Sequence, residues 1–387
     1  MRRPRTIIAG LGLAAMAVGG VTAVSAGGSP ASSAPSASTA AATARTAPAA
    51  VGRSTGAILV KAQAAAASTP GSLDPTFGNG GKVLSPGGGA TDAILQSNGD
   101  IVVSTGSGVA RFLPTGQLDA TFGSGGLASA GFVGGEGLQG VALQPDGKII
   151  WVGSQNTPGF PAFGTFSFAL ARFNANGTLD TSFGAGGTVL SSSLPNGITA
   201  LGLDAAGNIF TLPVRAEFSP TGQADAGVTP APITASSRGG SSAFLPSGQF
   251  VQATGVTVAK HDVDVQVQRF NADGSLASAG PAFDYSGAAG LDQAIDGAGA
   301  VAVQANGQAV AGGAHFLSTS PFGLARVNPD GTLDTGFGSG GVLTTTFNGN
   351  EAVEAVLTQP DGKIIAAGFS EDNTTGQSFI ALARYNP

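Results

Sequence analysis

Cysteine is absent from the chain of 387 residues, and its two methionines, Met1 and Met16, lie near the N-terminus. Disulfides, thiolate metal sites and a cysteine nucleophile are therefore excluded, so stability must come from packing. Charged residues are also scarce, at 10% of the chain, with a formal net charge of −6. This composition argues against a coiled coil, and an acidic chain with little lysine is not expected to bind nucleic acid.

The common catalytic motifs are absent as well. The sequence contains no G-x-S-x-G nucleophile elbow, no phosphate-binding glycine loop with lysine and no H-E-x-x-H metal motif. Its 63 glycines follow no three-residue period, which excludes a collagen helix. What the sequence does contain is an N-terminal leader, a low-complexity segment and a long repeat region.

The first 26 residues have the pattern of a secretory signal peptide. Arginines at positions 2, 3 and 5 precede an apolar run over residues 7–24, and Val24-Ser25-Ala26 supplies small residues at the cleavage positions. The pattern predicts cleavage after Ala26 and a secreted or cell-surface protein. A retained transmembrane anchor is the alternative, although glycines make the run only marginally apolar. If the leader is cleaved, the mature chain has no transmembrane segment.

Residues 27–70 are mostly Ala, Ser, Thr, Pro and Gly, which cannot bury enough surface to fold alone. We expect a disordered spacer here. The charge distribution supports a boundary at its end, because residues 1–70 hold six of the 17 basic residues and none of the 23 acidic ones.

From residue 71 the chain repeats one unit six times. Its first signature, G-x-L-D-x-x-F-G-x-G-G, stands at residues 71–81, 116–126, 177–187 and 331–341, with eroded copies from Gly222 and Gly274. The second is a hairpin of two apolar strands around an Asn-Gly or Asp-Gly turn, as in Leu143–Ile150, and the third is a strand such as Leu170–Asn174.

Each unit therefore holds four short antiparallel strands in about 50 residues, which is the size of a β-propeller blade. A glycine-rich β-solenoid is the competing interpretation, but its coils are shorter and contain no tight hairpins. The repeat region ends on a third strand at residues 382–387 and begins on a fourth at residues 71–74. We therefore predict an all-β fold over residues 71–387, a six-bladed β-propeller closed by the N-terminal strand completing the last blade.

The three linked signatures resemble the delta-60 repeat family of bacterial β-propeller proteins. The resemblance rests on Leu143–Ile150, Leu170–Asn174, Leu179-Asp180 and Phe183-Gly184, and it covers residues 71–387. It implies a secreted or surface-associated repeat protein whose biochemical activity is undefined. It carries over no catalytic residues.

Two charged positions recur in the repeat. One holds Arg111, Arg172, Arg269, Arg326 and Arg384, with Glu217 in the third copy, and the other holds Asp74, Asp119, Asp180, Asp225 and Asp334. The structural interpretation is that Asp organises the turn after the hairpin and Arg pairs with acids or carbonyls between blades. The alternative is a ring of arginines that binds an anion.

A second set of polar residues lies eleven residues before each hairpin glycine, where the chain enters the inner strand of a blade. It includes Glu136, Asn196, Asp296 and Glu351, which we expect to ring one mouth of the central channel. Glu136, Asp296 and Glu351 are candidate ligands of Ca²⁺ or another hard cation. Both histidines, His261 and His315, fall in loops predicted to open on the same face. The alternative is that these acids and amides only cap the inner strands.

Two functions follow from these features. The first is an exported, non-catalytic binding or scaffold protein, with a cell-envelope component or another protein as partner, and with contacts at the channel mouth and the loops between second and third strands. The second is a metal-dependent propeller hydrolase with an acidic site at the channel mouth. The fold alone does not decide between them.

Overall fold

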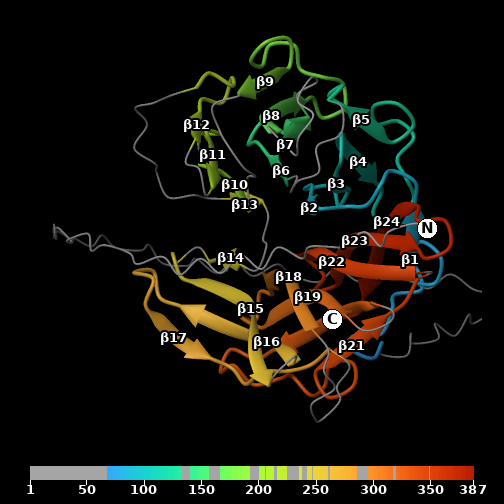
Figure 1. Ribbon diagram of the computed structural model, residues 1–387, viewed down its shortest axis with the longest axis vertical. Coiled ribbons are helices and arrows are strands. Elements are labelled where there is room, and N and C mark those ends of the chain that lie inside the picture. The colour runs from blue at the N-terminus through green and yellow to red at the C-terminus, as the bar shows by residue number, and fades with distance from the viewer. Residues whose placement is uncertain are drawn as a thin grey trace, which may run out of the picture. The chain divides into compact units, whose positions relative to one another are not determined.

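A computed structural model describes residues 68–132, 140–156, 166–191, 200–204, 206–212, 216–224, 235–237, 242–245, 247–259, 262–285, 295–316, 320–347 and 349–387. The predicted leader and nearly all of the predicted spacer lie outside these residues. All regular secondary structure in the described residues is β-strand, as the repeat predicts (Figure 1). This part of the chain accordingly contains no helix that could cross a membrane.

Three of the repeat units form plain antiparallel sheets whose strands are neighbours in chain order. In each, four strands follow one another from the inner to the outer edge. The first sheet comprises β2 (Asp92–Leu95), β3 (Ile101–Thr105), β4 (Gly108–Phe112) and β5 (Leu127–Ser129); the second comprises β6 (Gly140–Leu143), β7 (Ile149–Asn156), β8 (Phe166–Phe173) and β9 (Thr188–Ser191); and the fifth comprises β18 (Ile295–Val303), β19 (Ala309–Phe316), β20 (Phe322–Val327) and β21 (Val342–Thr345).

The third sheet departs from this order. It contains β10 (Ala200–Leu203), β11 (Ile209–Leu212), β12 (Ala216–Phe218) and β13 (Ala235–Ser237). The repeat predicts the fourth strand beside β12, but β13 pairs with β10 at the opposite edge. The third unit lacks the F-G-x-G-G segment that brings the chain back along the outer edge in other units.

The fourth sheet contains β14 (Ser242–Phe244), β15 (Phe250–Ala259), β16 (Asp262–Phe270) and β17 (Leu276–Ala279). Its outer strand β17 pairs with β16 through a register shift, which agrees with the eroded signature at Gly274. One parallel pairing, Val263 with Ile295, links this sheet to the fifth, so the two form a continuous eight-stranded sheet.

The sixth sheet joins the two ends of the repeat region. Its inner strands are β22 (Gly349–Thr358), β23 (Ile364–Asp372) and β24 (Ser378–Tyr385), and its outer strand is β1 (Lys82–Ser85), which lies beside β24 in Figure 1. Lys82 pairs with Ala383, and the Asp74 amide donates to the Arg384 carbonyl at 2.8 Å. The predicted pairing of the first strand with the last is therefore confirmed.

The apolar core lies between the sheets and not within a single layer. Side chains alternate along β7, so Ile149 and Trp151 pack toward the first sheet while Ile150 and Val152 pack toward the third. Five buried clusters of this kind join consecutive sheets: first to second, second to third, fourth to fifth, fifth to sixth, and sixth to first.

Candidate functional site

The two ends of the sheets differ in how regular they are. At one end, which we call the turn edge, every connection from the first to the second strand is five residues long: 96–100, 144–148, 204–208, 245–249, 304–308 and 359–363. At the opposite end, the loop edge, lengths vary widely, from residues 106–107 between β3 and β4 to residues 280–294 between β17 and β18. The repeat therefore fixes the length of the first hairpin at the turn edge, whereas the connections at the loop edge vary.

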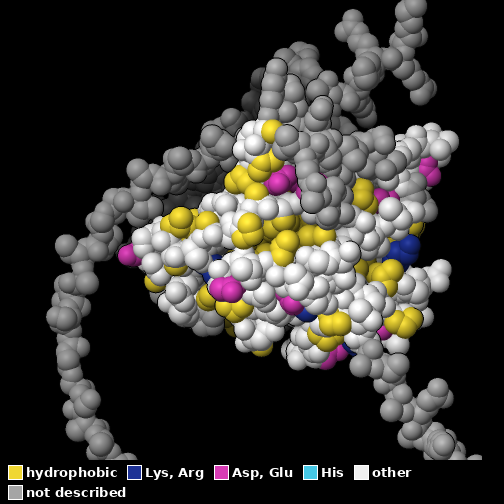
Figure 2. Space-filling view, turned by 90° about the horizontal axis from the view of Figure 1, so that it is seen from below, with side chains coloured by type: hydrophobic (Ala, Val, Ile, Leu, Met, Phe, Trp, Pro, Cys, Tyr) yellow, Lys and Arg dark blue, Asp and Glu magenta, His cyan; other side chains and the backbone are white. Residues whose placement is uncertain are grey.

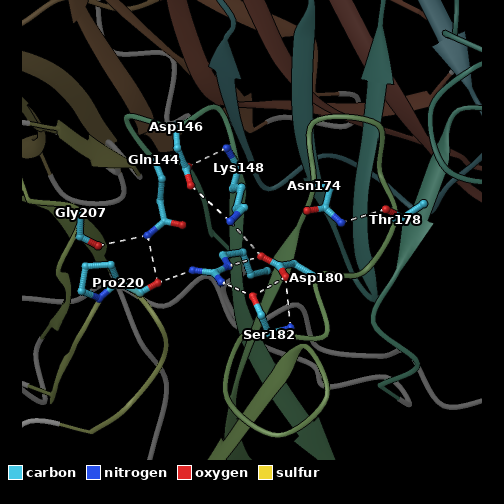
Figure 3. A network of polar contacts seen from close by, with 10 residues as sticks. Gln144, Asp146, Lys148, Asn174, Thr178, Asp180, Ser182, Gly207 and Pro220 are labelled. Atoms are coloured by element: carbon cyan, nitrogen blue, oxygen red, sulfur yellow. Dashed lines mark hydrogen bonds and ion pairs between the residues drawn. The ribbon is translucent and has the colours of Figure 1, made fainter.

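The turn edge carries the recurrent arginines and aspartates. In the second sheet, Arg172 Nε donates to Asp180 Oδ2 at 2.8 Å, and its Nη1 donates to the Pro220 carbonyl of the third sheet (Figure 3). The guanidinium lies 4.8 Å from the centroid of the Phe183 ring, which adds a cation–π contact. Arg172 thereby links its own aspartate to the next sheet.

We call the contact between two consecutive sheets a joint. Gln144, which was not among the predicted residues, also bonds across the joint between the second and third sheets. Gln144 Nε2 donates to the Gly207 carbonyl at 3.1 Å and to the Pro220 carbonyl at 3.4 Å (Figure 3). Gln304 makes the equivalent bond to Gly362 between the fifth and sixth sheets. The signal was present in the sequence, because Gln stands at the first position of the turn in four of the six units.

The same arrangement recurs at other joints. Arg111 pairs with Asp119 and donates to Ala175, and Arg384 pairs with Asp74 and donates to Pro114 of the first sheet. Arg326 pairs with Asp334 at 2.7 Å. Arg269 differs, because Ala277 stands where the aspartate is expected, and it donates instead to the Gly307 carbonyl at 2.8 Å.

The aspartates of these pairs also organise their own turns. Asp180 Oδ1 accepts hydrogen bonds from the amide and hydroxyl of Ser182. Burial raises the pKa of Asp180, but the hydrogen bonds from Ser182 and Lys148 and the charge of Arg172 outweigh it and lower the pKa to about 2. These contacts agree with the structural interpretation, since Arg172, Arg326 and Arg384 are buried and each donates through Nε to the aspartate that it pairs with.

Two of the predicted acidic residues, Asp296 and Glu351, lie in the described part of the chain, and both are at the loop edge. Asp296 is the second residue of β18 and is buried, with Oδ2 accepting the Tyr285 amide at 3.0 Å. Burial and the nearby Asp296 carboxylate raise the pKa of Tyr285. The backbone of His315 pairs with Asp296 in the β18–β19 register, and its side chain lies outside the described residues.

Glu351 is the third residue of β22 and is 1% exposed. Its Oε1 accepts hydrogen bonds from the Gly349 amide at 2.8 Å, the Phe347 amide at 3.3 Å and the Ser370 hydroxyl at 3.2 Å. These are the contacts of a carboxylate that fixes the start of an inner strand.

Asp92, the first residue of β2, also fixes the start of an inner strand. The residue type alone did not predict this role. It is buried, and its two oxygens accept the Ala93 amide at 2.8 Å and, across the joint, the Val141 amide of the second sheet at 2.9 Å. A carboxylate here satisfies amides from two sheets at once.

The remaining predicted residues, Glu136, Asn196 and His261, lie outside the described residues. Among the residues that are described, no three His, Asp or Glu side chains cluster closely enough to hold a metal ion. The described residues therefore do not test whether the predicted calcium ligands or the two histidines lie together, and the metal site stays a prediction.

Comparison with known proteins identifies the repeat. Three segments, residues 144–183, 304–337 and 359–387, match the family model described as "Domain of unknown function (DUF5122) beta-propeller". These three segments therefore match a β-propeller repeat. The matched segments come from the second, fifth and sixth sheets, and the first two contain an Arg–Asp pair of the turn edge. No curated protein matches the chain.

Solved structures resemble the chain only distantly. A putative oxidoreductase (glucose dehydrogenase) from Thermus thermophilus is 12% identical with a TM-score of 0.41, over 79% of this chain and 98% of that one. A thermostable family-43 glycoside hydrolase is 11% identical with a TM-score of 0.32, over 81% and 92% of the two chains. Likeness at this level says nothing about activity.

Proposed function

We propose that residues 71–387 form a closed six-bladed β-propeller of the delta-60 type, exported through the leader at residues 1–26, and that it is a binding protein without catalytic activity. The pairing of β1 with β24 and the five core clusters support the ring. Pro70 supports it too, because its carbonyl accepts the Gly338 amide at 3.1 Å, just as Asn176 accepts the Gly123 amide between the first and second sheets.

The observation that carries the binding function is the contrast between the two edges. The turn edge repeats one set of contacts, which makes a rigid frame, and the loop edge varies in length from unit to unit. Variable loops on a rigid scaffold are the usual location of ligand contacts. A cell-envelope component or another protein is the proposed ligand, bound at the loop edge.

Exchange of one loop tests this proposal. In the mature chain, residues 157–165 between β7 and β8 are replaced by the two-residue connection found between β3 and β4. We expect the immobilised wild-type chain to retain a component of a cell-envelope extract and the loop variant to lose it. The turn-edge variant Asp146→Ala, at an exposed residue, is the control and should retain it. No retained component, or equal retention by the loop variant, contradicts the proposal.

A metal-dependent hydrolase is the second candidate, favoured by the register that places His315 opposite Asp296. Calorimetric titration with Ca²⁺, Mg²⁺ and Mn²⁺ tests it. We expect no heat of binding and no change in melting temperature, because Glu351 is already occupied by three protein donors. Saturable binding of any of these ions that is lost in Glu351→Gln would favour the hydrolase instead.

A further inference from the structure

The fourth sheet differs from the others in what its two faces carry. Strands β3 and β20 are buried along their whole length, and the second sheet packs apolar side chains on both faces, so these three sheets are covered on both sides. In the first half of β15, residues 250–254, half-buried and buried residues alternate, and the partner strand β16 reads Val-Asp-Val-Gln-Val-Gln. Strict alternation of this kind is typical of a sheet with one face on the core and one in contact with water.

The apolar face packs on the fifth sheet through Val251, Ala253, Val265 and Val267. The opposite face presents four cross-strand pairs, of which two are uncharged and polar, one is aromatic and one joins valine to aspartate. They are Phe250 with Phe270, Gln252 with Gln268, Thr254 with Gln266, and Val256 with Asp264, all half-buried. We call this set the amide face.

The amide face belongs to the one joint without an apolar cluster among the described residues, that between the third and fourth sheets. The turn-edge residues that fasten other joints are also replaced there. Glu217 stands in place of the arginine, and Asp204 stands in place of the glutamine that bonds to the next sheet elsewhere. This joint therefore has neither the arginine nor the glutamine that links other sheets at the turn edge.

Part of the amide face is already ordered. Gln268 Nε2 donates to Gln266 Oε1 at 2.8 Å, and Gln266 Nε2 donates to the Gly280 carbonyl at 2.9 Å. The rings of Phe250 and Phe270 stack at 4.6 Å with an interplanar angle of 7°. Among the described residues, no hydrogen bond uses the side-chain amide of Gln252 or Oε1 of Gln268. These groups can form hydrogen bonds to a ligand. Little side-chain conformational entropy would be lost on binding, because part of the face is already ordered.

We propose that the amide face binds an uncharged, hydroxyl-rich carbohydrate. Sugar hydroxyls both donate and accept, so they satisfy either end of a glutamine amide, and the Phe250–Phe270 pair offers an apolar surface for the C–H side of a sugar ring. The pairs recur every second residue, about 6.7 Å apart along the strands, which suits a polymer with a short repeat.

Two other classes of ligand fit less well. A charged partner would meet only one ionisable side chain among the four pairs, Asp264. A protein with an apolar surface would bury glutamine amides without partners, which costs free energy. Figure 2 shows the side of the molecule where β16, β17 and β21 lie in Figure 1, and charged atoms there are scattered among uncharged polar and apolar ones.

The test is calorimetric titration of the mature chain with soluble uncharged polysaccharides (dextran, xyloglucan and galactomannan) and with charged ones (alginate and heparin). We expect saturable binding of at least one uncharged polymer. The double variant Gln252→Ala/Gln268→Ala should weaken it by about tenfold or more, the value for two lost hydrogen bonds. Gln377→Ala, the same change at an exposed position of the sixth sheet, should leave it within about twofold.

Hydrogen exchange provides a readout that does not depend on affinity. Bound polymer should slow amide exchange in β15 and β16 and leave β23 unchanged. No binding of any uncharged polymer, equal binding by the double variant, binding of charged polymers only, or protection of this face by a protein would overturn the proposal. The loop-edge binding function is separate, since exchange of residues 157–165 should not alter binding at the amide face.

Discussion

The two buried tyrosines differ in whether the hydroxyl group has a hydrogen-bond partner, and this difference should affect the stability of the folded state. The Tyr385 hydroxyl donates to Thr345 Oγ1 at 2.8 Å, whereas the Tyr285 hydroxyl is fully buried and has no hydrogen-bond partner among the described residues. An unsatisfied buried hydroxyl destabilises the folded state, and a satisfied one contributes to it. The two residues are therefore a matched pair for the same substitution.

We expect Tyr385→Phe to lower the free energy of unfolding by about 1 kcal/mol, because it removes that hydrogen bond and leaves Thr345 unpaired. Tyr285→Phe should leave the free energy of unfolding unchanged or raise it. Urea unfolding of both variants beside the wild type measures the difference. A larger loss for Tyr285→Phe than for Tyr385→Phe would contradict this reading of the core.

Asp180 forms ion pairs with two bases at the turn edge, so the contribution of a buried pair and of a more exposed pair can be compared on the same carboxylate. Asp180 contacts both Arg172, whose side chain is 5% exposed, and Lys148, whose side chain is 31% exposed. Without Arg172, the buried carboxylate of Asp180 loses its main charged partner. Arg172→Met should therefore lower the free energy of unfolding by about 3 kcal/mol. Lys148→Met should cost less than about 1 kcal/mol, since the lysine is solvated. Equal losses in urea unfolding would show that Arg172 is not the principal partner.

At the scale of the element, the sequence predicted the hairpins and the G-x-L-D-x-x-F-G segment because their backbone requires particular residues. Gly177 has a φ of 83°, and a Cβ on it would lie 2.6 Å from the Gly123 amide nitrogen of the neighbouring sheet. The place of β13 could not be predicted in this way, because no signature follows Ala224 in the third unit. Its pairing with β10 depends on tertiary context.

The turn segments also predict how the protein responds to acid. The pKa of Asp180 is about 2 in the folded chain, below its ordinary 3.8. Asp74 is shifted to the same value, because hydrogen bonds from Thr76 and the charges of Arg384 and Lys363 outweigh the effect of burial on its pKa. A carboxyl with a lowered folded pKa stabilises the protein above its unfolded pKa, and this stability is lost as pH falls.

We therefore expect the free energy of unfolding to fall steeply between about pH 4 and pH 2. Asp180→Asn should be less stable than the wild type at neutral pH and should lose less on acidification, since one of the shifted groups is gone. Urea unfolding at pH 7, 4, 3 and 2 checks both statements. An unchanged slope in Asp180→Asn would place the acid sensitivity elsewhere.

For the molecule as a whole, the sequence predicted the pairing of the two ends of the repeat region, because a missing fourth strand at one end matched an extra one at the other. The arrangement of the acidic positions was harder to predict. Spacing placed Asp296 and Glu351 at equivalent points, but it could not show that both side chains point into backbone donors. Which donors surround a carboxylate depends on neighbouring strands that the spacing does not describe.

Two truncations test the pairing of the ends. A chain that begins at residue 68 keeps β1, and a chain that begins at residue 87 lacks it. Without β1, strand β24 becomes an exposed edge, and Arg384 loses Asp74. We expect the shorter chain to melt at a lower temperature and to associate, as measured by light scattering after gel filtration. The longer chain should stay monomeric and keep the melting temperature of the mature protein.

The bond between β1 and β24 also sets an order of events during biosynthesis. Lys82 leaves the ribosome long before its partner Ala383, so the sixth sheet stays incomplete until β24 has emerged. Until then the nascent chain carries an unpaired strand at its leading end, which chaperones and proteases can recognise. A truncated product that lacks β24 keeps β1 unpaired. The pairing of β1 with β24 therefore distinguishes chains that contain the last strand from chains that lack it.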